Sequence, residues 1–346
     1  MNNYRVVFVF VAATAMMGLV VVPVLGQARQ GQQAEWQVPR TPDGQPDLQG
    51  VWDFRTITPF ERPDEFAGKE VLTAEEAAAF REKTLRLLDK DQRAGDGISV
   101  QRDVANAYNE FWWDYGDQLT ADGRTSLVID PPSGRLPALT AEAVRRAESP
   151  PAVQFEATRS GMAPASSWED MDLGDRCILG FNSGPPMTPS AYNNNFQLFQ
   201  TPGYVVILNE MVHNARIVPL DGRPHLPGQL RQWVGDSRGY WDGDALVVET
   251  RNFLRETGFV RGGSGAKLEL VERFSRVNEG TLLYEVTVTD PGTWTRPWMF
   301  AVPMKRSAEQ MFEYACHEGN YGMTNLLAGS RAQDSIPTVD GQTNSR

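Results

Sequence analysis

The stretch GDSRGYWDGDALVVETRNF, residues 235–253, decides the fold class of this chain. Two runs rich in strand-forming residues, 230–241 and 245–253, flank the dipeptide Asp242-Gly243. Asp-Gly between two such runs is the strongest short-range hairpin signal, because this tight turn requires positive φ at its central residues. The stretch therefore predicts two neighbouring antiparallel strands.

Similar patterns recur through the second half of the chain. Run 204–220 ends at Asp221-Gly222, 267–277 faces 281–290 across Glu279-Gly280, and 296–306 faces 310–317 across 307–309. Successive hairpins without intervening helices indicate an antiparallel meander, and about eight strands can close into a barrel. We expect a mainly β protein with a lipocalin-like barrel over residues 166–330.

The first half has a different character. Thr73 and Glu76 form a capping box, which predicts a helix that ends near residue 91. Further helices are expected at 104–116 and 140–148, and a hairpin or extended turn at 120–138. Residues 51–165 are therefore expected to form a partly helical, irregular part. A Gln-, Pro- and Gly-rich linker (27–50) precedes it, and a polar tail (331–346) ends the chain.

The charge balance narrows the classes of partner. The chain has 346 residues, with 33 Lys and Arg against 44 Asp and Glu, and a net charge of −11. Binding to nucleic acid or to anionic lipid needs clustered basic residues, so both are disfavoured. A small-molecule ligand or substrate is the expected partner. The oligomeric state is left open.

The N-terminus predicts export. Residues 1–26 contain Arg5 followed by an apolar run over 6–25, which is typical of a cleaved signal peptide. An uncleaved membrane anchor is the alternative, because the run is long enough to span a bilayer. After cleavage we expect a periplasmic or secreted protein without membrane attachment. There, Cys177 and Cys316 should form a disulfide rather than act as reactive thiols.

Glu272 is the first candidate for acid/base chemistry. Strand alternation places it on an apolar face. The other members of that face are Leu268, Leu270 and Phe274. A carboxylate there either has a perturbed pKa suited to proton transfer or pairs with an arginine. The candidates for such a partner are Arg216, Arg238 and Arg273.

The segment 204–218 is treated as one strand. Its alternation places Glu210 and Arg216 on one face and His213 on the other.

The chain has three histidines, His213, His225 and His317. His213 lies near Glu210, and His317 is flanked by acidic residues, so either could act as an acid or base. A three-histidine metal site is a weaker alternative, because the spacings match no local metal motif. No other cofactor is expected.

Aromatic and polar residues near the hairpins suggest a binding surface. The predicted substrate-binding residues are Arg216, Arg238, Asp236, Trp241 and Trp298. Rings beside arginines and carboxylates suit aromatic, sugar-like or carboxylate molecules. Ordinary packing of the rings, and Asp–Arg pairing that fixes the turns, are the alternatives.

Several long segments carry a resemblance. They include PDLQGVW (46–52), YNEFWWD (108–114), RTSLVIDPPSGRLP (124–137), the 235–253 stretch and FEYACHEGN (312–320). With these segments the chain resembles a family of exported bacterial proteins of about this size. The resemblance covers nearly the whole chain after the export signal and implies a single exported unit. It transfers no catalytic residues to this chain.

Together these features predict an exported enzyme that acts on a small organic molecule by acid/base chemistry. The reaction would be a hydrolysis, an elimination or an isomerisation, with Glu272 and His213 or His317 as proton carriers. The alternative is a periplasmic binding protein that uses the same barrel pocket without catalysis. Convergence of Glu272 with a histidine in an open cavity would favour the enzyme. Sealing of these groups by packing, or pairing with arginine, would favour the binder or a structural role.

Overall fold

A computed structural model describes residues 36–89, 91, 110–149, 165–259 and 263–334. Three predicted segments lie wholly or partly outside the described residues. They are the signal peptide (1–26), residues 27–35 of the linker and residues 335–346 of the tail. Gln37–Arg346 form one compact unit. In the described part of this unit, no helix is long and apolar enough to cross a membrane.

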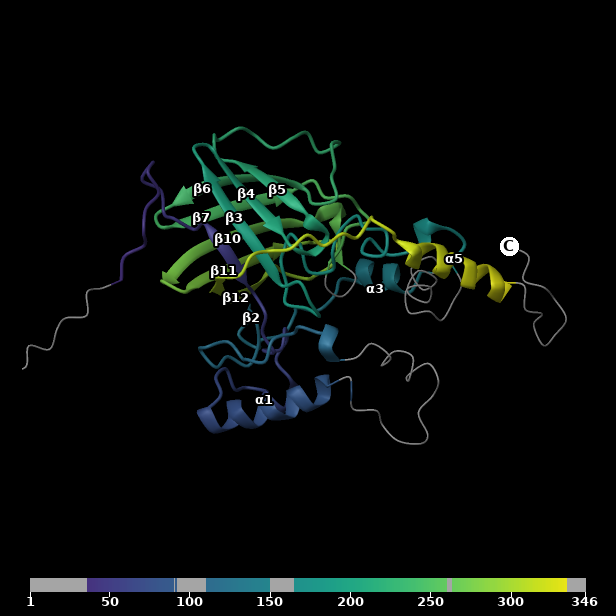
Figure 1. The fold of residues 1–346 in the computed structure, drawn as a ribbon, viewed down its shortest axis with the longest axis horizontal. Coiled ribbons are helices and arrows are strands. Elements are labelled where there is room, and N and C mark those ends of the chain that lie inside the picture. Colours follow the sequence, from purple (N-terminus) through teal and green to yellow (C-terminus); the bar gives the residue numbers. More distant parts are fainter. Residues whose placement is uncertain (1–35, 90, 92–109, 150–164, 260–262, 335–346) are drawn as a thin grey trace, which may run out of the picture. The chain divides into compact units, whose positions relative to one another are not determined.

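One antiparallel sheet of ten strands dominates the described residues (Figure 1). Its strands are β1 (Gly50–Asp53), β2 (Val128–Asp130), β3 (Asn195–Thr201), β4 (Tyr204–Asn209), β5 (Ala215–Pro219), β6 (Asp236–Asp242), β7 (Ala245–Arg251), β10 (Glu269–Asn278), β11 (Thr281–Thr289) and β12 (Trp298–Ser307). The order across the sheet is β5-β4-β3-β1-β12-β11-β10-β7-β6, and β2 pairs with β12. A small second sheet joins β8 (Gly258–Phe259) to β9 (Gly263–Ser264).

The Asp-Gly hairpin is confirmed. β6 pairs with β7 from Asp236↔Arg251 to Asp242↔Ala245, and Gly243 adopts a φ of 60° in the turn. The β10–β11 hairpin is confirmed as well. The predicted pairing of 296–306 with 310–317 is wrong. β12 pairs instead with β1, β2 and β11, and residues 310–317 form no strand.

The two edge strands of the sheet, β5 and β6, lie side by side without a ladder of hydrogen bonds between them. The approach depends on Gly239 of β6, where a Cβ atom would lie 2.9 Å from Val218 Cγ1 and 2.7 Å from Leu220 Cδ2. The sheet is therefore mainly β and antiparallel as expected, but it is not closed into a barrel.

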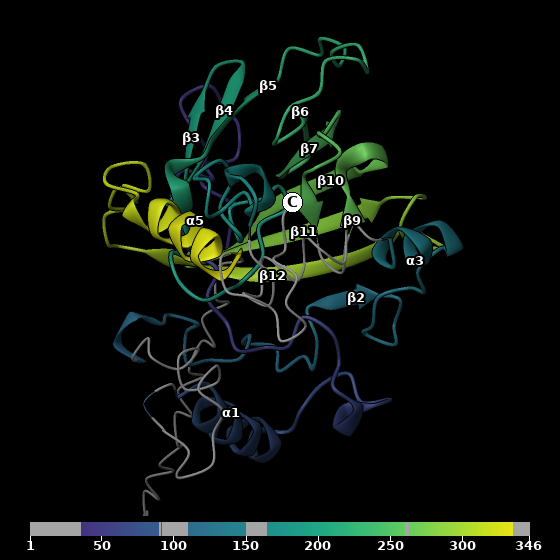
Figure 2. The ribbon, with the colours of Figure 1, turned by 90° about the vertical axis from the view of Figure 1, so that its right-hand side faces the viewer.

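The first half of the chain contributes to this sheet. β1 pairs with β3 on one side and with β12 on the other. β2 lies beside β12 (Figure 2). Residues 51–165 and 166–330 thus share one sheet and one core. Of the two structures predicted over 120–138, the hairpin is not formed, because β2 is the one described strand there and it pairs with the distant β12. The rest of the segment consists of turns and irregular chain, as the extended-turn alternative expected.

Three α-helices are present in the described residues, and two of them match the sequence. α1 (Ala74–Leu88) begins at the predicted capping box of Thr73 and Glu76, and α3 (Ala141–Ala147) begins with Thr140 as its N-cap. α5 (Tyr321–Asp334) was not expected. The expected helix 104–116 falls partly outside the described residues, and its described part contains only the 3₁₀ turn Glu110–Trp112.

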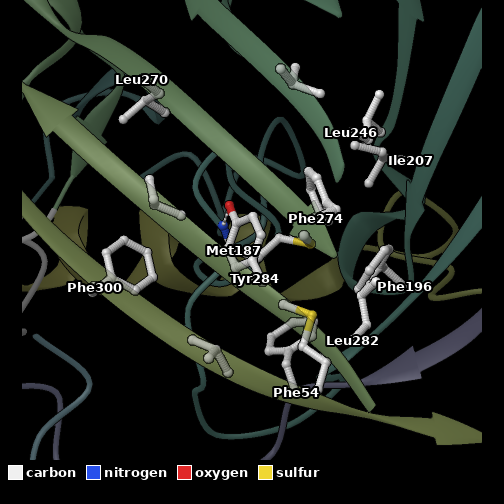
Figure 3. Close-up of a cluster of buried hydrophobic side chains, with 14 of the residues drawn as sticks. Phe54, Met187, Phe196, Ile207, Leu246, Leu270, Phe274, Leu282, Tyr284 and Phe300 are labelled. Carbon is white, nitrogen blue, oxygen red and sulfur yellow. Dashed lines mark hydrogen bonds between the residues drawn. The ribbon is translucent and has the colours of Figure 1, made fainter. Parts of the chain in front are cut away.

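The core lies on one face of the sheet, where alternate side chains of every long strand meet (Figure 3). Its largest fully buried side chains include Trp52, Trp294, Trp298, Tyr284, Phe54, Phe196, Phe274 and Phe300. Burial of each such ring stabilises the fold by about 1.5–3 kcal/mol relative to exposure. The face that carries Glu272 is therefore filled by packed side chains.

Candidate functional site

Glu272 lies within the core and is fully buried. Its carboxylate accepts hydrogen bonds from both terminal nitrogens of Arg216, at 2.6 and 2.8 Å. The hydroxyl of Tyr284 donates to Oε1 of Glu272 at 2.6 Å, and itself accepts the Met187 N–H at 3.1 Å. The carboxylate is thus paired with a cation and a hydroxyl, as the salt-bridge alternative expected.

The pKa shifts of Arg216 and Tyr284 fix the protonation of these two partners of Glu272. Burial lowers the pKa of Arg216, but the charge and hydrogen bonds of Glu272 outweigh that effect and leave it raised. Burial, together with the charge of Glu272, raises the pKa of Tyr284 well above its ordinary value. The arginine stays charged and the tyrosine stays protonated near neutral pH. Glu272 therefore has the surroundings of a structural ion pair.

Arg216 reaches Glu272 because the chain breaks between β4 and β5. The single strand expected over 204–218 is wrong: a turn at 210–214 intervenes, and Arg216 of β5 pairs with Ile207 of β4 on the buried face. The turn contains Val212 and His213 with φ of 58° and 40°. Because neither is glycine, no sequence signal marked the break.

The histidines lie in two places. His213 and His317 are exposed neighbours with ring centroids 6.2 Å apart, and Nδ1 of His213 lies 3.1 Å from the Tyr314 carbonyl oxygen. His225 instead contacts Asp236 through Nδ1 at 2.8 Å. Within the described residues no histidine hydrogen-bonds to Glu272, and no group of three or more His, Cys, Asp or Glu could hold a metal ion. The structure does not bring the three histidines together.

Asp236 and Arg238 fix the loop before β6. One carboxylate oxygen of Asp236 accepts from Arg238 at 2.6 Å, and the other accepts the Leu226 N–H at 2.9 Å. With His225 on the same carboxylate, three groups converge on one buried aspartate. The arrangement matches the alternative in which Asp–Arg pairing holds the turn.

The two predicted aromatic contacts differ in exposure. Trp298 is fully buried and packs edge-on to Trp294, so it presents no surface to a ligand. Trp241 is partly buried and lines a cavity of about 160 Å³ together with Leu220 and Gln200. Of the predicted binding residues, Trp241 alone lines one of the cavities described in this section.

Two larger cavities adjoin each other on the other side of the sheet from the core. The first has a volume of about 260 Å³ and the second about 390 Å³. Arg55 and Asp114 line both, so the cavities share a wall. We call the pair the outer cleft. Its remaining main lining residues are Val51, Tyr192, Asn195, Glu210, Ser307 and Phe312 in the first cavity, and Asp53, Glu110, Trp113, Tyr115, Asp117 and Lys305 in the second.

Strand alternation in β1 positions the floor of this cleft. Trp52 is fully buried in the core, so its neighbours Val51 and Asp53 face the opposite way. The β1–β12 register places Ser307 opposite Val51 and Lys305 opposite Asp53. The outward residues of two paired strands thus form the base of both cavities.

Arg55 forms the shared wall together with two aspartates. Its Nε and one terminal nitrogen donate to Asp53 at 2.9 and 2.8 Å, and its other terminal nitrogen donates to both oxygens of Asp114 at 2.7 and 2.8 Å. These hydrogen bonds, that of Asp53 first, raise the pKa of Arg55 despite partial burial. One cation is therefore surrounded by two anions.

Aromatic rings line the cleft next to these charges. Trp113 stacks on Tyr115 with centroids 5.4 Å apart and planes 7° apart. Tyr192 meets Trp113 edge-on at 6.3 Å, and Phe181 meets Tyr192 edge-on at 5.3 Å. These rings connect the walls of the two cavities.

A disulfide and a strained turn pack against Tyr192, which lines the first cavity. Cys177 and Cys316 are bonded, which confirms the predicted disulfide and fits an extracellular location. Beside it pack Met211 and Val212 of the turn after β4. Val212 has positive φ, a costly conformation for a β-branched residue. The strained turn at Val212 and the disulfide thus lie in one packed cluster beside the first cavity.

Sequence reasoning missed most residues of the outer cleft. Trp113 and Asp114 lie in the segment YNEFWWD, whose dense aromatic and acidic content was the available signal. Arg55 is 59 residues away from Asp114, so only the fold joins them.

Comparison of the chain with protein-family models, with characterised proteins and with solved structures found no match.

Proposed function

We propose that this protein is an exported small-molecule-binding protein whose ligand occupies the outer cleft. The observation that carries the proposal is the contrast between the two sides of the sheet. The core side holds Glu272 in a closed ion pair, whereas the other side has adjoining open cavities with rings, amides and charges. Concave sites with a few polar groups among aromatic walls are the usual form of small-molecule sites.

The other parts of the proposal concern location and fold. The N-terminal sequence and the disulfide support export to the periplasm or beyond. The side-by-side arrangement of β5 and β6 supports a lipocalin-like barrel that is incomplete in its hydrogen bonding. An acid/base enzyme stays a prediction, but it would need a proton carrier other than Glu272.

The proposal is tested by blocking the first cavity. Ser307 lines it from the outward face of β12, so Ser307→Trp would fill it. Ser275→Trp is the matched control, because Ser275 lies on β10 away from the cavities described above. Saturation-transfer NMR with a mixture of amines, sugars and carboxylic acids would report binding. We expect at least one compound to bind the wild type and the control but not Ser307→Trp. Failure of every compound, or equal binding to all three proteins, would overturn the proposal.

A further inference from the structure

Glu210 lacks the partner that Glu272 has. It directly follows β4, lines the first cavity and is 8% exposed. Its Oε2 accepts a hydrogen bond from Asn195 Nδ2 at 2.8 Å. In the part of the chain that the structure describes, no Lys, Arg or His forms an ion pair with it.

A buried carboxylate without a cation is costly. Desolvation of the charge is repaid only by a close opposite charge and by hydrogen bonds to the remaining lone pairs. The same chain meets this requirement for Glu272 with the bidentate Arg216. Glu210 has no such arginine and borders the open cavity, so a cationic group that enters the cavity would form an ion pair with it.

The charges of the residues that line the first cavity also favour a cationic ligand. Among the described residues, Arg55 is the one cation that lines it, against the three acids Asp114, Glu210 and Glu309. Arg55 is already held by two aspartates. In the adjoining cavity, burial and the charge of Glu110 raise the pKa of Tyr115. Acidic side chains thus outnumber basic ones around both cavities, and a cleft with an excess of negative charge attracts cations.

The aromatic rings of the outer cleft favour an organic cation over a metal ion as the ligand. A hard metal ion needs several oxygen or nitrogen ligands, and no group of three or more acidic, His or Cys residues in the described residues could hold one. Tyr192 lines the same cavity as Glu210, and Trp113 and Tyr115, which stack on each other, line the adjoining cavity. Tyr192 meets Trp113 edge-on, so the rings run from one cavity to the next. Ammonium groups bind to such faces within about 6 Å of a ring centroid.

We infer that the outer cleft binds a small organic ammonium ion, with Glu210 as its charge partner and the Trp113–Tyr192 wall as its aromatic contact. The inference rests on the proposed binding function and names the ligand class for that site. A first cavity of about 260 Å³ suits an ammonium group with a short substituent.

The test compares two molecules of nearly equal shape. Choline carries a quaternary ammonium, and 3,3-dimethylbutan-1-ol replaces its nitrogen with carbon. Isothermal titration calorimetry would measure both against the full exported protein, Glu210→Gln and the control Glu269→Gln, which removes an exposed carboxylate on β10. We expect choline to bind about tenfold more tightly than the alcohol, and Glu210→Gln alone to abolish this preference.

The possible results distinguish failure of the ammonium inference from failure of the proposed binding function. Equal affinity for the two molecules, no choline binding, or an unchanged preference in Glu210→Gln would overturn the inference. The binding function would still stand if another compound bound the wild type and were lost in Ser307→Trp. It would fall if no compound bound at all.

Discussion

The buried pair of Glu272 and Arg216 offers the sharpest test of the structural role assigned to Glu272. Glu272→Gln removes the negative charge, keeps the side-chain size and leaves an oxygen to accept from Tyr284. The Arg216 side chain is 2% exposed, so its charge would remain buried without compensation. Breaking a buried pair in this way costs about 3–5 kcal/mol. For a unit of roughly 300 residues, that lowers the melting temperature by about 5–8 °C.

A second substitution distinguishes a structural pair from a general loss of packing. Arg216→Met in the Glu272→Gln background removes the orphaned charge while keeping apolar volume in the core. We expect the double variant to regain at least half of the lost free energy of unfolding, as buried pairs replaced by apolar groups do. Urea denaturation of the wild type, Glu272→Gln, Arg216→Met and the double variant completes the double-mutant cycle. Additive losses, or a single variant as stable as the wild type, would refute the reasoning.

Three further predictions concern stability and charge. Replacing Cys177 and Cys316 with serine should lower the free energy of unfolding by about 2–5 kcal/mol, since the disulfide closes a 139-residue span; denaturation without reductant measures it, and an unchanged midpoint would contradict it. Thr73→Ala should cost about 1 kcal/mol through loss of the α1 cap, and a loss near zero in the same assay would count against the capping box. Arg223 donates to Asp221 and holds the pKa of that carboxyl at about 2. Arg223→Ala should return the pKa of Asp221 toward 3.8 in a carboxyl-carbon NMR titration. An unmoved pKa would show that Arg223 is not its cause.

Local signals predicted the local structure well. Asp242-Gly243 marked a hairpin, and Thr73 with Glu76 marked a helix start, because these short motifs satisfy backbone requirements by themselves. β1 escaped prediction because it is only four residues long. β2, with three residues, lies in a segment predicted as extended, but its pairing with the distant β12 was missed. Such short segments show too little alternation to be recognised.

The site was harder to predict for a similar reason. Alternation correctly placed Glu272 on an apolar face, and Arg216 was among its named partners. The break at Val212 was invisible, because a positive φ at a valine is set by its surroundings and not by its intrinsic preference. The wall of Arg55 and Asp114 depends on how distant segments pack, which no spacing in the sequence encodes.

The position of a bound ammonium ion tests most directly whether the outer cleft is the site. Arsenocholine replaces the nitrogen of choline with arsenic, whose anomalous scattering distinguishes the cation from protein and water atoms in a crystal. We predict one strong peak beside the Glu210 carboxylate and within about 6 Å of the Trp113 or Tyr192 ring centroid. A peak on the core side of the sheet near Glu272, or no peak in the outer cleft, would contradict this assignment.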